Sequence, residues 1–554
     1  MMIMKLQRLQ RLATLLLLLG VFLSVAHAYD FVSGGIYYNI TSTTNMTASV
    51  TYFSKTNNAY SGTVTIPAFV SHGGKDYTVT AIGEYAFVGC TSLDKVEFTS
   101  DHLKTIGNYA FSGCNGMKNV VIPNHITQIG NGAFNGCYGI TGVTIEEGEE
   151  TLTLGCNYYD TSGKGKGLFY DCPLYSVFIG RTLSYATSNV NYYGYSPFAK
   201  ITTLEKARLG NPVTSIQNYL FYGCTSLKTM VYNSQCKPTL VSIYAFYGCT
   251  SLTWDGVGLP ESVKTIGSYA FQNCTKLTNL VIKPHITTIN NGAFNGCTGI
   301  TGVTIEEGEE TLTLGCNYYD TSGKGKGLFY DCPLSSVFIG RPLSYATSNV
   351  NYYGYSPFAN ITTIETANLG NLVKSVQGYL FYGCKSIVDG DGIIPSSVTS
   401  IGERAFSGCA KLKTITIPNK VKSIGQYGFA NCTELVRVTS LATTPPSIYA
   451  NCFSENTYNN ATLIVHNANA YGQAVGWKLF QNVEESGVVT EITDVQTDAP
   501  EITVFNGIIH AEGLDMKVFN MSGYLIGEGS EVPVTPGLYI VKVGGKSFKV
   551  QIKL

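Results

Sequence analysis

One stretch decides the fold of this chain: IGERAFSGCAKLKTITIP, residues 401–418. Its Ile415-Thr416-Ile417 segment alternates apolar and polar side chains, which indicates a short, half-buried strand. Pro418 ends that strand because proline has no N–H to donate to a ladder. The Ile401-Gly402 pair predicts a turn, followed by a short helical or extended stretch that holds Ala405-Phe406. A single unit of this kind has an apolar side that it cannot bury alone.

The same frame recurs along the chain, with a Cys three residues after the Phe and an aliphatic residue six after it. Regular copies are centred on Phe87, Phe111, Phe134, Phe221, Phe246, Phe271, Phe294, Phe381, Phe406 and Phe429, and degenerate ones on Phe169 and Phe329. In clean runs these phenylalanines lie 23 to 25 residues apart. Stacked units share one continuous core. The pattern therefore predicts a β-rich α/β solenoid with strands lining one face.

The cysteines follow the repeat, because twelve of the sixteen occupy the slot three residues after the Phe. In that slot Cys acts as a small buried hydrophobe, and disulfides between adjacent coils are the remaining alternative. The other four are Cys156, Cys236, Cys316 and Cys452. Since there is no C-x-x-C and no paired His spacing, the sequence nominates no metal and no cofactor. It also contains no G-x-S-x-G and nominates no catalytic residue, so we expect a binding protein rather than an enzyme.

The repeat resembles a known family. The phrase I-G-x-x-A-F-x-x-C-x-x-L-x-x-V-x-I-P is close to the consensus of the BspA-like leucine-rich repeat surface proteins of bacteria, over roughly residues 80–440. The resemblance implies a leucine-rich-repeat array with a β N-terminal cap, and a role in adhesion to host proteins or other cells. We place the solenoid at 81–442, the cap at 29–80 and a closing unit at 443–483.

Both ends of the chain carry export signals in the sequence. Residues 1–28 have a basic start, a short apolar run and the small residues of a cleavage site, which predicts a signal peptide cut between Ala28 and Tyr29. A polar, acidic linker at 484–500 leads to a strand-rich segment at 501–554. Its VFNMSGYLI…TPGLYIVKVGGKSFKVQIK pattern resembles the C-terminal sorting domain of the type IX secretion system. That resemblance implies a small C-terminal β-sandwich and display on the outer surface of a Gram-negative bacterium.

A longer duplication lies over the coil repeat, with residues 121–224 matching 281–384. Residues 131–203 and 291–363 differ at only four positions: Tyr138/Thr298, Tyr175/Ser335, Thr182/Pro342 and Lys200/Asn360. Each copy contains two insertion-like stretches, TIEEGEETLTLGCNYYDTSGKGKGLFYDC and YATSNVNYYGYSPF in the first copy, which we interpret as loops.

These loops are the predicted binding surfaces, because loops on a rigid scaffold commonly carry recognition and Tyr offers contact area at low entropy cost. The predicted ligand-binding residues are Tyr158, Tyr159, Tyr192, Tyr193 and Tyr195, and in the second copy Tyr318, Tyr319, Tyr352, Tyr353 and Tyr355. Two equivalent sites would allow avidity. The alternatives are that these tyrosines only cover the core, and that the duplication has no selected role.

Charge and hydropathy limit the classes of partner that we expect. The formal net charge is −1 and only 13% of residues are charged, so neither nucleic acid nor an anionic membrane is expected as the partner. After residue 28 no run of 18 apolar residues occurs, so we expect no transmembrane segment in the mature chain. We predict host matrix or cell-surface proteins, glycans or other bacterial cells as partners. A self-associating surface or biofilm component is the alternative, and a carbohydrate-active enzyme the least favoured one.

Overall fold

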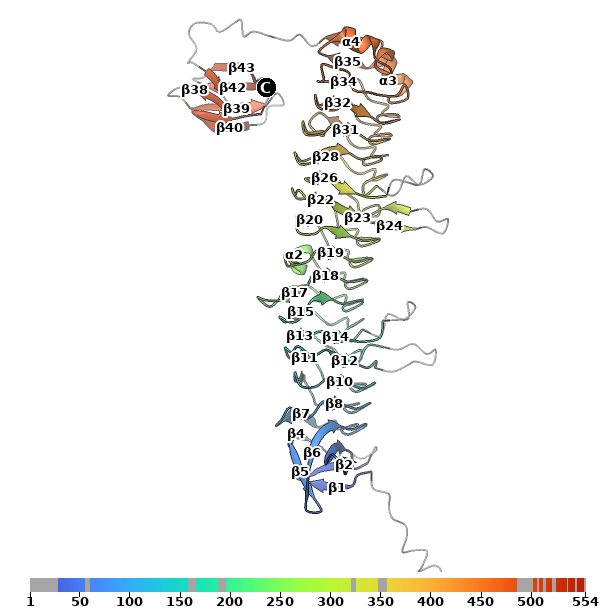
Figure 1. Cartoon of the computed structure of the whole chain (residues 1–554), viewed down its shortest axis with the longest axis vertical. Coiled ribbons are helices and arrows are strands. Elements are labelled where there is room, and N and C mark those ends of the chain that lie inside the picture. The colour runs from blue at the N-terminus through green and yellow to red at the C-terminus, as the bar shows by residue number, and fades with distance from the viewer. Residues whose placement is uncertain are drawn as a thin grey trace, which may run out of the picture. The chain divides into compact units, whose positions relative to one another are not determined.

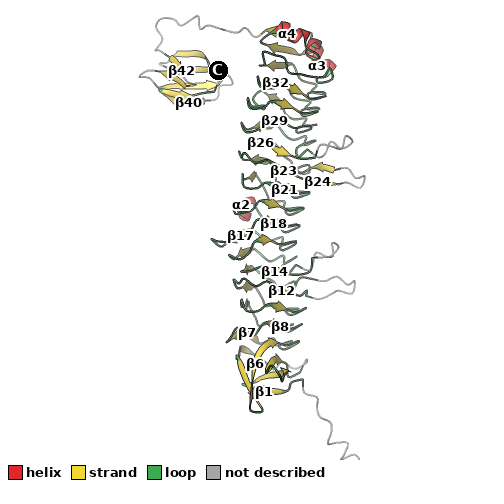
Figure 2. Ribbon diagram, in the orientation of Figure 1, coloured by secondary structure: helices red, strands yellow, loops and turns green. Residues whose placement is uncertain are grey.

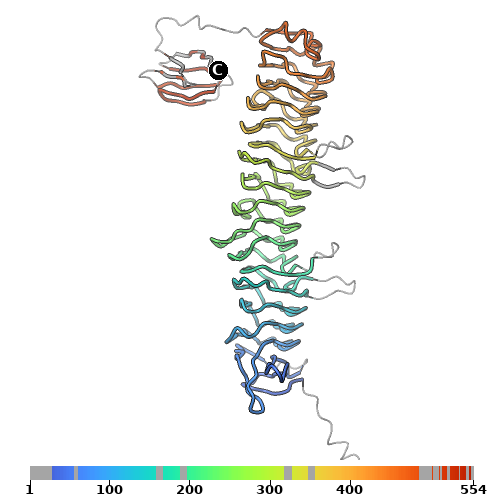
Figure 3. The backbone as a smooth tube through the Cα atoms, in the orientation of Figure 1, coloured from blue at the N-terminus to red at the C-terminus, as the bar shows by residue number. Residues whose placement is uncertain are grey.

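The computed structural model describes residues 28–54, 60–157, 166–187, 196–319, 325–346 and 356–485, and most of 502–552. The chain forms two compact units, Met1–Ser486 and Gly487–Leu554. In the first unit the backbone winds into coils stacked one on another (Figures 1 and 3). Strands dominate and helices are few among the described residues (Figure 2).

One set of strands, ladder A, comes from the Val-x-Ile segments of the repeat. Its strands form four sheets, within which neighbouring strands pair in parallel, and buried positions such as Val120, Val143 and Val177 are in register across coils. The alternating burial follows from the pleat, which sends successive side chains to opposite faces. Ladder A consists of β4 (Gly62–Ile66), β7 (Leu93–Phe98), β9 (Asn119–Ile122), β11 (Gly142–Ile145), β13 (Ser176–Ile179), β15 (Lys206–Leu209), β17 (Thr229–Tyr232), β20 (Leu280–Ile282), β22 (Gly302–Ile305), β26 (Ser336–Ile339), β28 (Thr366–Leu369), β30 (Asp389–Gly390), β32 (Thr414–Ile417), β34 (Arg437–Ser440), β35 (Thr462–Val465) and β36 (Asn482–Glu485).

A second set, ladder B, comes from the residues just before the Ile-Gly pair. The expectation that strands line one face is therefore wrong, because the segment expected to be a turn also pairs in parallel with its neighbours. Ladder B consists of β6 (Lys75–Ile82), β8 (Thr105–Ile106), β10 (Gln128–Ile129), β12 (Leu152–Leu154), β14 (Leu183–Ser184), β16 (Ser215–Ile216), β18 (Leu240–Val241), β19 (Thr265–Ile266), β21 (Thr288–Ile289), β23 (Leu312–Leu314), β27 (Leu343–Ser344), β29 (Ser375–Val376), β31 (Ser400–Ile401) and β33 (Ser423–Ile424).

The first strands of the chain continue ladder B. In their sheet β2 (Ile36–Ser42) lies between β1 (Phe31–Ser33) and β3 (Thr47–Thr51), and β3 pairs with β6. The β5 strand (Phe69–His72) forms a hairpin with β6. Inside this group the Tyr38 side chain is fully buried and stacks on Phe31 with ring centroids 5.3 Å apart. These strands thus cover the first coil of the stack with a small aromatic core.

The segment that holds Ala-Phe is neither helical nor extended, which corrects the sequence expectation. It is a run of turns, and its second residue adopts a left-handed conformation, as at Tyr109 (φ 52°), Tyr244 (φ 56°) and Tyr427 (φ 57°). The coil has to reverse direction within a few residues here, and a positive φ at one position turns the backbone sharply enough to do so.

The phenylalanines of the repeat form one continuous stack of fifteen rings. Neighbouring ring centroids lie between 5.1 and 6.3 Å apart, and the rings are mostly close to parallel. The stack comprises Phe87, Phe111, Phe134, Phe169, Phe198, Phe221, Phe246, Phe271, Phe294, Phe329, Phe358, Phe381, Phe406, Phe429 and Phe453. Phe169 and Phe329, the degenerate copies, lie in the stack. So do Phe198 and Phe358, which the sequence frame missed.

Eleven of the twelve motif cysteines lie beside this stack and donate to a Phe carbonyl of the coil before them. Cys114 Sγ donates to the carbonyl of Phe87 at 3.0 Å, and Cys137 Sγ to that of Phe111 at 3.0 Å. All sixteen thiols are free and buried, so the adjacent-coil disulfide alternative is not present in this structure. Burial raises the pKa of Cys137 to about 12, which keeps the thiol protonated and able to donate.

In the described part of the first unit, helices occur only within ladder A and near the end of the solenoid. The short α2 helix (Trp254–Val257) separates β17 from β20 in ladder A, and the Trp254 indole N–H donates to the carbonyl of Val281. Near the end of the first unit, α3 (Glu455–Asn460), α4 (Ala468–Gln473) and the 3-10 turn η2 (Trp477–Leu479) accompany β35 and β36. The fully buried Trp477 contacts Phe453 there, at a ring centroid distance of 5.9 Å.

The second unit contains two antiparallel sheets. One has β37 (Ile502–Phe505), β38 (Ile508–Ala511) and β41 (Glu531–Pro533), and the other has β40 (Leu525–Gly529), β39 (Met516–Asn520), β42 (Gly537–Val543) and β43 (Lys546–Ile552) in that order. Side chains from both sheets, among them Ile509, Val518 and Val541, form one buried cluster.

Candidate functional site

Both insertions of a copy leave the solenoid at the same corner, between ladder B and the phenylalanine stack. In a regular coil Phe111 follows the last ladder B residue, Ile106, by five positions. Phe169 follows Leu154, which is in register with that slot, by fifteen positions. The next coil repeats the pattern, since Phe198 follows Tyr185 by thirteen. The extra residues are thus looped out of two adjacent coils while the core slots stay filled.

The base of the first insertion is closed by hydrogen bonds of Asn157. Its backbone N–H donates to the carbonyl of Lys166 at 2.6 Å, which joins the two ends of the insertion. Its side-chain Nδ2 donates to Asp171 Oδ2 at 2.9 Å, and the same oxygen accepts from the backbone N–H of Gly136 at 3.2 Å. Asn157 is fully buried, so this link ties the start of the insertion to the later part of its own coil and, through Asp171, to the coil before it.

In the second copy the corresponding insertion begins as a two-stranded antiparallel ribbon. β24 (Cys316–Tyr319) pairs with β25 (Gly325–Gly327), with Cys316 opposite Gly327 and Tyr319 opposite Gly325. The Cys316 N–H donates to Asn291 Oδ1 at 3.0 Å, just as Cys156 N–H donates to Asn131 Oδ1 in the first copy. The first insertion therefore starts from an anchored residue in each copy.

The base of the second insertion is closed by a tyrosine and a serine. Tyr185 hydroxyl donates to the carbonyl of Asn218 at 2.8 Å, and Ser196 Oγ donates to that of Leu220 at 3.0 Å. Burial raises the pKa of Tyr185, so the hydroxyl keeps the proton that it donates. The second copy repeats the arrangement with Tyr345, whose hydroxyl donates to Gly378 at 3.0 Å.

Most of the predicted binding tyrosines lie outside the described residues, namely Tyr158, Tyr159, Tyr192, Tyr193, Tyr195, Tyr352, Tyr353 and Tyr355. Tyr318 and Tyr319 lie in β24, where only the backbone is described. The predicted signal peptide, up to residue 27, also lies outside them, and Ala28 is the first described residue. Of the predicted sites, the structure thus describes the bases of the insertions.

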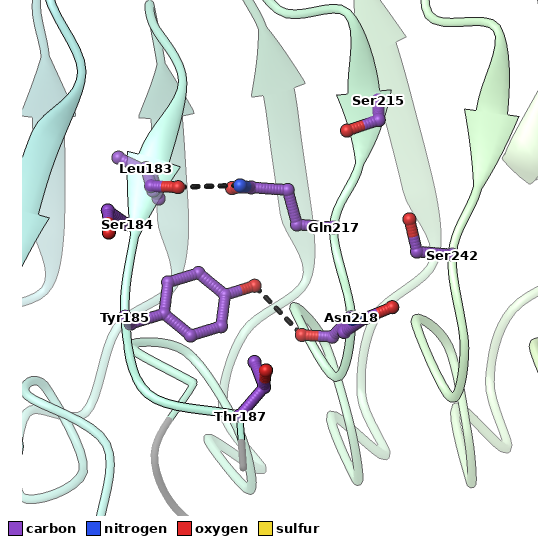
Figure 4. Close-up of a pocket in the computed structure, with 8 residues that line it drawn as sticks. All are labelled: Leu183, Ser184, Tyr185, Thr187, Ser215, Gln217, Asn218 and Ser242. Atoms are coloured by element: carbon purple, nitrogen blue, oxygen red, sulfur yellow. Dashed lines mark hydrogen bonds between the residues drawn. The ribbon is translucent and has the colours of Figure 1, made fainter.

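Ladder B opens at the coil that carries the second insertion. Although both strands are described, β14 does not pair with β16, and the sheet that ends at β14 resumes as a new one at β16. The second copy opens at the same place, between β27 and β29. In each opening a glutamine side chain spans the gap: Gln217 Nε2 donates to the carbonyl of Leu183 at 2.6 Å (Figure 4), and Gln377 Nε2 donates to that of Leu343.

The position that directly follows the last ladder B residue differs at the openings. In most coils it is Gly, because a Cβ there would meet the previous coil: at Gly107 it would lie 2.6 Å from Glu84 N. Gln217 and Gln377 occupy this slot in the two openings, whereas Ser242 and Asn290 occupy it in closed parts of the ladder. A residue other than Gly in this slot is therefore compatible with an opening but does not by itself predict one.

The first opening contains a groove of about 310 Å³. It is lined by Leu183, Ser184, Tyr185, Thr187, Ser215, Gln217, Asn218 and Ser242. In Figure 4 the Tyr185 ring points across the gap towards Asn218; Ser184 and Ser215 lie in β14 and β16, and Ser242 directly follows β18. Among the described lining residues none carries a charge, and all but Leu183 carry a hydroxyl or an amide. The groove is suited to hydrogen bonding with a neutral ligand.

Chemistry at the thiols is unfavourable. Burial raises the pKa of Cys224 and of Cys432 to about 12, so both thiols are protonated at neutral pH and are poor nucleophiles and metal ligands. Over the described part of the chain, no group of three or more His, Cys, Asp or Glu side chains is arranged to hold a metal ion.

The comparison with protein families decides the identity of the repeat. The family model of the BspA type leucine-rich repeat region matches six overlapping or adjoining segments: 56–190, 153–252, 191–322, 237–344, 325–388 and 390–493. The chain belongs to this family. The expected resemblance to the BspA-like repeat is thereby confirmed, together with a strand-dominated, parallel-sheet repeat fold.

Solved structures of other leucine-rich repeat proteins are similar to this BspA-type protein. A leucine-rich repeat protein from Bacteroides ovatus is 22% identical, with 83% of this chain and 99% of that one covered and a TM-score of 0.43. A leucine rich cell surface protein from Faecalibacterium prausnitzii is 18% identical over 83% and 95% of the two chains, with a TM-score of 0.28. The pneumococcal vaccine antigen PcpA is 14% identical over 83% and 100%, with a TM-score of 0.26. No curated protein matches the sequence.

Family membership sets the general class of this BspA-type protein. The family consists of leucine-rich repeat proteins of the surface type, typically surface-bound or secreted, and it is not a family of enzymes. Within the described residues, no helix has the length and apolar character needed to cross a membrane.

Proposed function

We propose that this protein is an exported surface adhesin that binds host matrix or cell-surface proteins, glycans or other bacterial cells through its two insertion-bearing corners. One observation carries the proposal. In each copy two adjacent coils loop extra residues out of the same corner, and the bases of these loops are closed by buried anchors such as Asn157, Tyr185 and Tyr345. A scaffold that fixes only the bases of Tyr-rich loops is typical of recognition surfaces.

The duplication supports binding at two points. The repeated corners lie 160 residues apart in sequence, on one continuous phenylalanine stack. Two tethered sites raise the effective concentration of the second one after the first has bound. A partner with repeated epitopes, such as a matrix fibre or a glycan-coated cell, would gain most from this arrangement.

The experiment compares loop variants of the full chain. In one, serines replace the ten predicted tyrosines; in another, 158–165, 188–195 and their counterparts are shortened to the length of a regular coil. We expect binding to immobilised matrix proteins or bacterial cells to fall at least roughly ten-fold, with the thermal unfolding midpoint unchanged. Binding that survives shortening of all four insertions would contradict the proposal.

A matched control is available in the duplication itself. Tyr138 is 67% exposed and Tyr175 is 46% exposed, but both lie outside the insertions and are Thr298 and Ser335 in the second copy. The Tyr138→Thr/Tyr175→Ser variant removes exposed tyrosines with residues that the fold already accepts. It should bind like the natural protein if the insertions, rather than tyrosine content, carry recognition.

Export and sorting form part of the same proposal. Tyr29 packs on Tyr37 with ring centroids 4.7 Å apart, which supports Tyr29 as the first residue of the mature fold after cleavage at Ala28. The second unit, with its two sheets around one cluster, supports the proposed β-sandwich sorting domain of the type IX system. Truncation after residue 500 in a Gram-negative host with that system should abolish surface display, and N-terminal sequencing of the secreted chain should begin at Tyr29.

A further inference from the structure

The two openings of ladder B have no role in the fold that a regular coil does not already fulfil. In a regular coil, backbone hydrogen bonds join the neighbouring strands of ladder B. In each opening, a glutamine side chain instead bonds across the gap between the two strands. The same departure occurs twice, at Gln217 and at Gln377. We propose that the opening between β14 and β16 is a binding site for a neutral sugar residue of a glycan. This rests on the proposed binding function and names a ligand class for it.

The lining of the groove matches the hydrogen-bonding needs of a sugar. Ser184, Ser215 and Ser242 offer hydroxyls that both donate and accept, and Asn218 adds an amide. A sugar ring presents hydroxyls of the same dual character on all its edges. The lining thus has the mixture of donors and acceptors that a polyhydroxylated ligand needs, with no fixed preference for either.

The charge of the groove selects a neutral ligand. None of the described lining residues is ionisable except Tyr185, whose pKa is raised by burial and which is therefore neutral. In the sequence, segment 188–195 after Thr187 contains no Asp, Glu, Lys, Arg or His either. A sialylated or sulfated residue would lose water around its charge without gaining a counter-charge, which is unfavourable.

The size and position of the groove also fit. Its volume of about 310 Å³ lies at the lower end of the range of small-ligand sites, roughly 300–1,000 Å³. Ser184 and Thr187 at its rim are exposed, so a bound residue would remain connected to the rest of a glycan in solvent. A site for one terminal or internal residue follows, rather than a closed pocket for a free metabolite.

An extended peptide fits the opening less well. A peptide that adds to a sheet edge needs the free backbone carbonyls of that edge. Here the carbonyl of Leu183 accepts from Gln217 Nε2 and that of Asn218 accepts from the Tyr185 hydroxyl. Two side chains of the protein already occupy carbonyls that border the opening, whereas the three serines come from three successive coils.

The two openings share one wall and differ in the other. Leu183 to Thr187 lie within the nearly identical segment 131–203, so this wall is repeated in the second copy. The opposite wall comes from the next coils, where Asn218 and Ser242 of the first copy correspond to Gly378 and Gly402 of the second. The second opening lacks one amide and one hydroxyl, and we therefore assign the stronger site to the first copy.

The test is a glycan array carrying neutral, sialylated and sulfated oligosaccharides, probed with the full chain and with Asn218→Gly/Ser242→Gly. This variant gives the first opening the residues of the second one. We expect retention on neutral glycans only, and an apparent affinity of the variant reduced roughly ten-fold, as expected for two lost hydrogen-bonding partners. Ser215→Ala is a second variant, which keeps the test valid if the glycine pair unfolds the chain.

The control is Thr265→Ala, since Thr265 occupies the ladder B slot of Ser215 in a closed part of the sheet. It should bind glycans like the natural protein. An empty array, retention on charged glycans only, or equal retention by the Asn218→Gly/Ser242→Gly and Ser215→Ala variants would overturn the proposal, and so would loss of protein or peptide binding alone in these variants. The insertion variants test the proposed adhesion function separately. If the tyrosine variant still binds glycans but no longer adheres, the groove remains the sugar-binding site although the insertions carry adhesion.

Discussion

A regular coil and an insertion-bearing coil solve the same packing problem differently. Between Thr105 and Phe111 the chain passes from ladder B to the core by the shortest route, and β8 pairs on both sides. Between Leu183 and Phe198 it loops out extra residues and β14 pairs on one side only. Phe198 nevertheless stacks on Phe169 at 5.5 Å and on Phe221 at 6.3 Å. The core is therefore continuous where the surface is not, which lets the corner vary without cost to the stack.

The largest expected loss of stability comes from substitutions in the phenylalanine stack, which test whether the core is continuous. Phe246 in a regular coil and Phe198 in an insertion-bearing coil are both fully buried in the stack. Replacing either by Ala should lower the free energy of unfolding by about 3–5 kcal/mol, because each substitution leaves a cavity between two rings. Denaturant titration of the two variants measures the comparison directly.

The control for these variants is Phe69→Ala, since Phe69 is 57% exposed. It should cost much less than either core substitution. A small effect of Phe198→Ala beside a large one of Phe246→Ala would show that the insertion-bearing coil is only loosely part of the core.

The second largest change in stability is expected at the position directly after the last ladder B residue, which is Gly107 in a regular coil. At Gly107 an added Cβ would lie 2.6 Å from Glu84 N and 2.7 Å from Gly83 C, so Gly107→Ala should destabilise by about 1–3 kcal/mol through overpacking. Gln217 occupies the same slot in the opening, and Gln217→Ala should cost only about 1 kcal/mol for its hydrogen bond to Leu183. The thermal unfolding midpoints of the two variants measure which substitution costs more stability. Equal costs would mean that the coils are no further apart at the opening.

Loss of the Tyr185 hydrogen bond at the base of the second insertion should lower stability only locally. Tyr185→Phe removes the hydroxyl that donates to the carbonyl of Asn218, and about 1 kcal/mol of local stability with it. Limited proteolysis within 188–195 should speed up roughly five-fold, since cleavage follows the population of the opened segment. Tyr345→Phe should do the same in the second copy. A change in global stability instead of local cleavage would assign the tyrosine to the core.

The smallest effect concerns the thiols. Cys137 Sγ lies 3.0 Å from the carbonyl of Phe111 in a regular coil, whereas Cys172 Sγ lies 3.9 Å from that of Phe134 after the first insertion. Cys137→Ala should cost more than Cys172→Ala by roughly half a kcal/mol, the value of a weak S–H hydrogen bond. Paired unfolding curves check the difference. The reverse order would mean that volume rather than hydrogen bonding sets the cost.

Much of the fold could be predicted from the sequence, and the exceptions have physical causes. The Phe-Cys-Leu spacing located the core because buried positions tolerate few residue types. Ladder B was missed because a strand of two residues, such as Ser215–Ile216, is too short to show alternation. Phe198 was missed because Ile201 occupies the slot three residues after it, where the frame has Cys. For the candidate site, sequence indicated the insertions and their tyrosines, but not the groove at their base.

The sequence alone determined the repeat, the family and the duplication, because these depend on which residues recur at which spacing. It did not locate the opening, because non-Gly residues such as Asn290 also follow ladder B strands where the ladder is closed. Only the tertiary structure decided that Tyr185 reaches Asn218, that three serines from successive coils line one groove, and that β14 and β16 stay apart. Contacts between coils join residues some 25 positions apart, and their distances depend on how the coils stack rather than on any local pattern.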